Sequence, residues 1–221
     1  MEGIRLWLFD IDGTLVDTGG AGLLALKEAA TECFGGEGPE LDLAGSTDSG
    51  IVLNMFSHFG LPHSDDQVER FYEFYLGRLE WNLAHAGFEG RVLPGAVDLL
   101  DQLAADEDAT VGLLTGNIAG GAALKMRHYG LDHHFAFGAY GCDFADRNLL
   151  GPIALDRAAK HSGRSFSPEE TLVIGDTPKD IACAHAMGSK CLAVATGKFS
   201  VDELLEAGAD FALPGLSEFG I

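Results

Sequence analysis

The sequence predicts a doubly wound α/β protein, a Rossmann-like parallel sheet that carries an inserted helical segment. Three observations support this fold class. Short apolar runs typical of buried parallel strands recur along the chain, helical patterns alternate with the later runs, and residues 18–90 contain only helix-like patterns. The predicted domains are therefore an α/β core made of residues 1–17 and 91–221, and a helical cap made of residues 18–90.

Five runs of apolar residues are the predicted strands of the core. They lie at Ile4–Phe9, Thr110–Leu114, Thr171–Ile174 and Cys191–Ala195, with a weaker run at Phe211–Leu213. Helical patterns begin at Pro94 and at Pro178, since proline favours the first turn of a helix. The alternation of strand and helix indicates a parallel sheet with helices on both faces.

The segment 18–90 breaks this rhythm. Helices are predicted at Ala21–Phe34, Asp48–Phe59 and Ser64–His85. Most of the aromatic residues of the third helix are predicted to form the core of a small bundle, with a binding role as the alternative; they are Phe71, Tyr72, Phe74, Tyr75 and Trp81. The glycine-rich turn at residues 17–22 is a plausible hinge. The polar stretch 44–50 is interpreted as a helix N-cap, with the alternative that it faces a site from the cap.

Composition excludes some classes of partner. The 221 residues carry a formal net charge of −20, and such a surface repels nucleic acids and anionic membranes. The four cysteines have no metal-binding spacing, and no run approaches the length of a membrane span, so we expect a cytoplasmic protein. A small anion remains a possible ligand if a local cation is present. The sequence does not determine the oligomeric state, and a monomer is favoured.

The first strand ends in the sequence "DIDGT", which places Asp10 and Asp12 on either side of one isoleucine. Side chains two residues apart on an extended segment point the same way, so the two acids converge where the strand ends. Gly13 and Thr14 then let the chain turn. In open α/β sheets this is the edge where ligands bind.

Two further strand ends add polar groups to the same edge. The run "VGLLTGN" ends in Thr115, Gly116 and Asn117, which offer neutral donors to a phosphate oxygen. The run "LVIGDTPKD" ends in Asp176, with Asp180 one helical turn later. Helix capping explains one of these acids but not both.

Four carboxylates in one crevice repel one another unless a cation lies among them. A site made only of oxygen ligands selects a hard cation such as Mg²⁺, and zinc is disfavoured because no histidine lies beside these acids in the sequence. The metal-binding candidates are Asp10, Asp12, Asp176 and Asp180. Magnesium would also supply the positive charge that a phosphoryl group needs.

In order, the motifs "DIDGT", "LLTGN" and "GDTPKD" resemble those of the haloacid dehalogenase-like hydrolase superfamily, in its phosphoglycolate-phosphatase-like branch with a helical cap. The resemblance implies an aspartyl-phosphate mechanism in which Asp10 is the nucleophile and Asp12 the general acid and base. It also implies that the Asp12 carbonyl joins Asp10 and Asp176 in binding Mg²⁺, and that Asp180 supports the metal's waters. Thr115 would bind a phosphoryl oxygen, assisted by Gly116, Asn117 and the loop at Gly13 and Thr14.

One part of the family pattern is missing. The resemblance leads us to expect a lysine before the helix that precedes the last motif, but Leu149 stands at that position. Arg147 is the nearest cation and is favoured as the replacement, with Lys125 as the alternative, which would also bind phosphate. Lys179 lies inside the last motif.

The predicted function is a Mg²⁺-dependent phosphatase, a phosphoric monoester hydrolase that acts on a small phosphorylated metabolite such as phosphoglycolate. A sugar phosphomutase of the same fold remains an alternative. A second alternative is a protein without turnover, either a phosphate-binding relative or a receiver-like switch. The second acid, Asp12, and the helical insert favour turnover.

Overall fold

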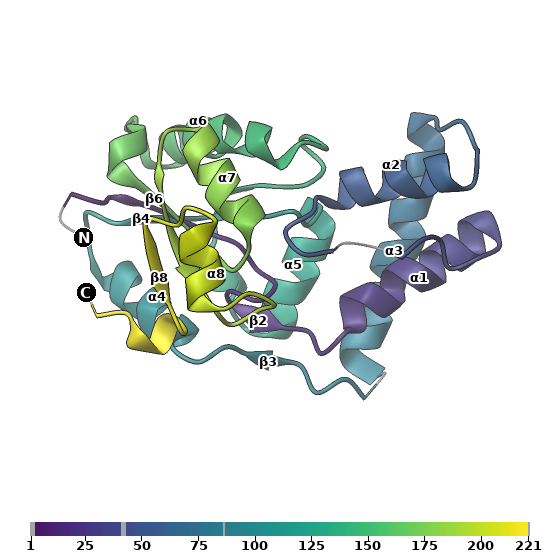
Figure 1. Cartoon of the computed structure of the whole chain (residues 1–221), viewed down its shortest axis with the longest axis horizontal. Coiled ribbons are helices and arrows are strands. Elements are labelled where there is room, and N and C mark those ends of the chain that lie inside the picture. The colour runs from purple at the N-terminus through teal and green to yellow at the C-terminus, as the bar shows by residue number, and fades with distance from the viewer. Residues whose placement is uncertain (1–2, 41–42, 86, 221) are drawn as a thin grey trace.

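A six-stranded parallel sheet with helices on both faces forms the body of the protein (Figure 1). The computed structural model describes residues 3–40, 43–85 and 87–220. The strands follow the order β5-β4-β1-β6-β7-β8 across the sheet. Their bounds are β1 Leu6–Phe9, β4 Thr110–Leu114, β5 Gly138–Ala139, β6 Thr171–Gly175, β7 Lys190–Val194 and β8 Phe211–Leu213.

Two apolar layers hold the helices against this sheet. Helices α6 (Leu150–Ser162), α7 (Pro178–Ala186) and α8 (Val201–Glu206) contribute to the cluster on one face, and α4 (Ala96–Ala105) and α5 (Ala119–His128) contribute to the other. Alternate residues of β1 supply both layers, since Leu6 and Leu8 belong to the first and Trp7 and Phe9 to the second. The central strand is buried on both faces, as its unbroken apolar sequence predicts.

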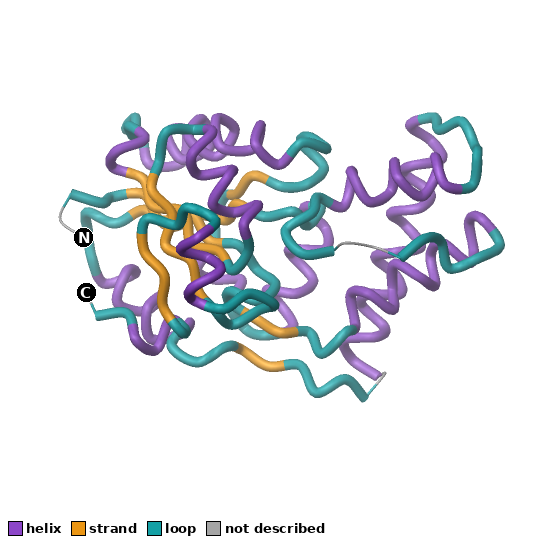
Figure 2. Tube along the Cα trace, viewed as in Figure 1, coloured by secondary structure: helices purple, strands orange, loops and turns teal. Residues whose placement is uncertain are grey.

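Three helices stand together at one end of the molecule: α1 (Ala21–Phe34), α2 (Asp48–His58) and α3 (Asp65–His85) (Figures 1 and 2). They share an apolar cluster of their own, to which Phe71 and Tyr75 contribute fully buried rings. Tyr72 and Phe74 pack against this cluster, so most of the predicted aromatic residues belong to it, and Trp81 is the exception among them. Its side chain is 53% exposed and stacks on His85 one helical turn later.

The chain enters and leaves this helical region through a pair of short antiparallel strands, β2 (Val16–Asp17) and β3 (Arg91–Val92). The predicted domain boundaries fall beside this pair. The β2–β3 pair and β5 were not predicted, because a strand of two residues is too short to show a periodic pattern of apolar residues. The predicted α/β fold class is confirmed. Within the described residues, no helix is long and apolar enough to cross a membrane.

Candidate active site

The predicted site residues meet at the carboxyl edge of the sheet because the strands that carry them are parallel neighbours. Asp10 follows β1, Thr115 follows β4, and Asp176 follows β6. Asp180 lies one turn into α7, where its Oδ2 accepts hydrogen bonds from the backbone and hydroxyl of Thr177. This capping box fixes Asp180 toward the strand ends.

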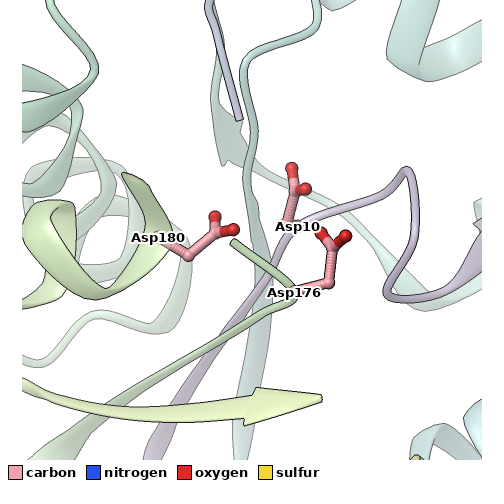
Figure 3. Close-up of side chains that lie close together, drawn as sticks. All are labelled: Asp10, Asp176 and Asp180. Carbon is pink, nitrogen blue, oxygen red and sulfur yellow. The ribbon is translucent and has the colours of Figure 1, made fainter. Parts of the chain in front are cut away.

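Asp10, Asp176 and Asp180 form a buried cluster of carboxylates (Figure 3). One oxygen of each lies within 4.8 Å of the others. The Asp176 Oδ1 atom is buried and has no hydrogen-bond partner among the residues that the structure describes, which is unfavourable unless a ligand binds it. With three carboxylates and Arg147 beside them, the cluster is left with two negative charges, which one divalent cation would balance. An oxygen-only donor set with one unpartnered oxygen fits a hard cation.

The backbone leaves room for Asp176 by using glycine on two sides. A Cβ atom on Gly13 would lie 2.3 Å from Asp176 Oδ2, and one on Gly197 would lie 1.8 Å from the same atom. Gly13 also has a positive φ of 79°, where a side chain is strained. Any larger residue at either position would push the carboxylate out of the cluster.

Arg147 is buried in the centre of the cluster. Its Nη2 lies 3.1 Å from Asp10 Oδ1 and also pairs with Asp180 Oδ1, while Nη1 donates to the carbonyl of Gly45 at 3.0 Å. The 3₁₀ turn Arg147–Leu149 directs Arg147 inward and leaves Leu149 48% exposed. The cation that reaches Asp10 therefore enters two residues before the position where a lysine was expected.

Lys125 serves a different carboxylate. Its Nζ lies 2.6 and 2.8 Å from the two oxygens of Asp12 and 2.6 Å from Asn117 Oδ1. Asn117 Nδ2 in turn donates to Asp12 at 2.8 Å. The Asp12 carboxylate is therefore not a member of the cluster of Asp10, Asp176 and Asp180, and Lys125 and Asn117 hold it at the wall of the pocket.

The other predicted phosphate-binding residues fall into two groups. Gly13, Gly116 and Asn117 line the pocket together with Asp10, Asp12 and Lys125. Thr14 and Thr115 are fully buried behind this surface. The Thr115 hydroxyl accepts from Asn117 Nδ2 at 2.9 Å, whereas the Thr14 hydroxyl has no partner in the described part of the chain.

Burial dominates the electrostatics of the carboxylates. It raises the pKa of Asp10 to about 6, against the attraction of Arg147 and with the repulsion of Asp180 and Asp12 added. Burial, Asp180 and Asp10 raise the pKa of Asp176 to about 9. Burial opposes the charge of Arg147, but Asp180 and Asp10 outweigh it and raise the pKa of the guanidinium. The site therefore attracts a proton or a cation.

The structure adds pocket residues that sequence analysis missed. The pocket above Asp10 has a volume of about 420 Å³, and its lining includes Asp48, Tyr75 and Lys198. Lys198 follows β7. Its position after a predicted strand, in the sequence "TGK", could have identified it as a residue of the site. Asp48 and Tyr75 belong to the helical region. Asp48 lies in the polar stretch 44–50, for which facing a site was the alternative interpretation, whereas the sequence carries no comparable signal for Tyr75. The stretch 44–50 is both an N-cap, through Thr47, and a pocket wall.

Comparisons with known proteins identify the family of the chain. The family model for haloacid dehalogenase-like hydrolases matches residues 7–194. A phosphoglycolate phosphatase of Rhodospirillum rubrum is 28% identical, with 94% of this chain and 88% of that protein covered. One of Chromobacterium violaceum is 27% identical, with 99% of this chain and 96% of that protein covered.

Solved structures with a similar fold support the α/β fold class. A hydrolase from Pseudomonas syringae has a TM-score of 0.72 at 25% identity, over 97% of this chain and 95% of that one. CbbY from Rhodobacter sphaeroides, solved in complex with phosphate, has a TM-score of 0.76 at 19% identity, over 98% and 96%. The predicted phosphatase class agrees with the family and with the names of the relatives. The chain belongs to the haloacid dehalogenase-like hydrolases, in the phosphoglycolate-phosphatase-like branch of that family.

Proposed function

We propose that this phosphatase hydrolyses small phosphoric monoesters through an aspartyl phosphate on Asp10, with Mg²⁺ as its metal. The observation that carries the proposal is the placement of Asp10. Its carboxylate lines the pocket, lies 3.1 Å from the Arg147 guanidinium, and belongs to a cluster with a carboxylate oxygen that lacks a partner. A buried nucleophile beside cations is what phosphoryl transfer requires.

In the first half-reaction Asp12 starts as the neutral acid. An Asp10 oxygen bonds to phosphorus, the ester P–O bond breaks, and Asp12 gives its proton to the leaving alcohol oxygen. Lys125 and Asn117 then hold the Asp12 carboxylate at the pocket wall. In the second half-reaction Asp12 takes a proton from water as the water attacks phosphorus. The bond to Asp10 breaks, and inorganic phosphate leaves.

Asp10, Asp176 and the backbone carbonyl of Asp12 would hold the metal, and the bound ion would neutralise charge on the phosphoryl oxygens. Asp180 is the weaker candidate as a direct ligand. Both of its oxygens already accept hydrogen bonds, from Arg147 and from Thr177. We assign it to holding Arg147 and to supporting the metal's waters.

We further propose that residues 18–90 act as a cap over this site. The pocket is lined from both sides, by strand-end residues of the core and by residues of α1, α2 and α3. The β2–β3 pair, next to the glycine turn at residues 19 and 20, would be the joint on which the cap moves.

Release of phosphate from p-nitrophenyl phosphate tests the proposal. We expect release that depends on Mg²⁺ and is lost in Asp10→Asn, which keeps the size of the side chain but removes the nucleophile. Phosphoglycolate, named in both relatives, is the natural first metabolite to assay. Release that is unchanged by a chelator, or unchanged in Asp10→Asn, would overturn the mechanism. Interconversion of sugar phosphate isomers without release would indicate a mutase.

A further inference from the structure

The wall of the pocket that faces the phosphoryl site comes from the helical cap. Its lining side chains are largely apolar, from Leu23 and Leu26 of α1, Leu43 before α2, and Ile51 of α2. Among the described cap residues that line the pocket, none is lysine, arginine or histidine. The one charged side chain they contribute is the carboxylate of Asp48.

The Asp48 carboxylate is buried, and the hydrogen bond found for it among the described residues is to one of its two oxygens. It is 7% exposed, and Oδ2 accepts the backbone N–H of Ile118 at 2.8 Å. The Asp48 backbone N–H donates to the carbonyl of Gly116 at 2.7 Å, which fixes the residue above the Thr115–Asn117 turn. Within the described part of the chain, no side chain is hydrogen-bonded to Oδ1. That oxygen is available to accept from a bound molecule.

Tyr75 lines the same part of the pocket from α3. Its ring is 1% exposed, and no hydrogen bond of its hydroxyl is found among the described residues. Asp48 and Tyr75 therefore present an acceptor and a donor–acceptor to whatever enters between the cap and Asp10.

The three cations of the pocket all belong to its core side. Arg147 is paired with Asp10 and Asp180, and Lys125 is paired with Asp12. Lys198 lies beyond Thr196 and Gly197, which pack against Gly13 and Asp176. Arg147 and Lys125 are thus already paired with carboxylates of the core. The Nζ of Lys125 also borders the cap, since a Cβ atom on Gly22 of α1 would lie 3.7 Å from it. A carboxylate at the cap end would lie among apolar side chains and beside Asp48.

We propose that the leaving group of the true substrate is an uncharged alcohol that carries a second hydroxyl, which Asp48 and Tyr75 bind. The inference rests on the proposed function and narrows its substrate class. A hydroxyl donates to Asp48, whereas a carboxylate or a second phosphate is repelled by it and finds no cation on the cap. Monoesters such as phosphoglycolate are then poor substrates.

A matched pair of substrates tests this. 2-Hydroxyethyl phosphate and 2-phosphoglycolate differ only in a CH₂OH against a carboxylate, and ethyl phosphate lacks both groups. With Mg²⁺ present, we expect kcat/KM for 2-hydroxyethyl phosphate to exceed that for phosphoglycolate by about tenfold to a hundredfold, the range of a hydrogen bond to a charged group. Ethyl phosphate should lie well below 2-hydroxyethyl phosphate.

Variants locate the effect. In Asp48→Asn the amide still accepts from Ile118 but presents donors to the pocket, so the preference for 2-hydroxyethyl phosphate should fall about tenfold or more. Tyr75→Phe, which keeps the ring, should reduce the same preference. Leu23→Arg, at a position 40% exposed on the pocket rim, should raise kcat/KM for phosphoglycolate. Asp66→Asn, on the exposed start of α3, is the control and should change no ratio.

The outcomes separate this inference from the proposed function. Hydrolysis of phosphoglycolate at a rate equal to or above that of 2-hydroxyethyl phosphate overturns the inference and leaves the phosphatase intact. An unchanged preference in both Asp48→Asn and Tyr75→Phe, with each variant folded by circular dichroism, also overturns it. Absence of Mg²⁺-dependent release from every ester, p-nitrophenyl phosphate included, overturns the proposed function itself.

Discussion

Replacement of Arg147 by methionine should damage both stability and catalysis. The guanidinium is 6% exposed and donates to Asp10, Asp180, and the carbonyls of Gly45 and Leu114. Methionine fills much of the same volume but leaves Asp10 and Asp180 as buried carboxylates without their cation. Breaking a buried ion pair by removing one partner costs about 3–5 kcal/mol, because the remaining charge is uncompensated.

For a chain of this length, each kcal/mol shifts Tm by about 2–4 °C, so Arg147→Met should lower Tm by roughly 6–20 °C in the absence of divalent cations. Arg147→Lys should lower it less, since the charge remains but the planar fork is lost. The double variant Arg147→Met with Asp180→Asn should be more stable than the sum of the single losses predicts. The second change removes one of the stranded charges.

Thermal unfolding followed by circular dichroism measures these shifts, and phosphate release measures the catalytic part. We expect kcat to fall about 10²- to 10³-fold in Arg147→Met, as when a charge-stabilising donor is removed. Lys125→Met is the comparison, because its pairing is with Asp12 and not with Asp10. A variant without Arg147 that melts within about 1 °C of the wild type and keeps its kcat would refute the role assigned to this cation.

Other variants test the metal, the glycines and the pH response. Mg²⁺ at about 100 Kd should stabilise the wild type by about 2.7 kcal/mol and Asp176→Asn far less, measured by denaturant unfolding with and without EDTA. Gly197→Ala should weaken this Mg²⁺ response by displacing Asp176, whereas Gly77→Ala, with open space around it in α3, should stabilise by about 0.5–1 kcal/mol. Burial raises the pKa of Asp48 to about 6, above its value in the unfolded chain, so the wild type should lose roughly 1–3 kcal/mol relative to Asp48→Asn as pH rises from about 4 to 7. An equal slope in both proteins would contradict that burial effect.

The core half of the site could be predicted because it follows from local pattern plus one rule of topology. Asp10 and Asp176 each follow an apolar run, and parallel strands bring their carboxyl ends to one edge. Adjacent strands then place the two carboxylates side by side. The same reasoning extends to Lys198 after β7, which was missed because its run was interpreted as a strand alone.

The preference for Arg147 over Lys125 came from its nearness to the expected lysine position in the sequence, and the topological rule adds nothing to it. Both lie within reach of the strand ends, and the outcome depends on how the turn at Arg147–Leu149 is oriented on α7. That orientation is set by packing, since Cys183 donates to the carbonyl of Arg147 and Leu149 is left outside. Sequence spacing carries no information on which side chain of such a turn points inward.

The part of the site that comes from α2 was harder still to predict from the sequence. Asp48 reaches Ile118 across 70 residues of sequence, and this contact exists only because α2 docks on the turn after β4. An aspartate at the first position of a helix is equally well explained by the helix dipole. Only the packing of α2 on that turn shows that the Asp48 carboxylate also faces a pocket.

Charge balance then explains how a protein of net charge −20 can hold a phosphate. Around the pocket the described residues place five carboxylates, Asp10, Asp12, Asp48, Asp176 and Asp180, against three cations, Lys125, Arg147 and Lys198. Fully ionised, this set carries two negative charges and repels a dianion. One divalent ion cancels that charge. Removal of the metal should therefore weaken the binding of inorganic phosphate itself, measured by calorimetry, and equal affinity with and without Mg²⁺ would show that the ion acts only on the chemical step.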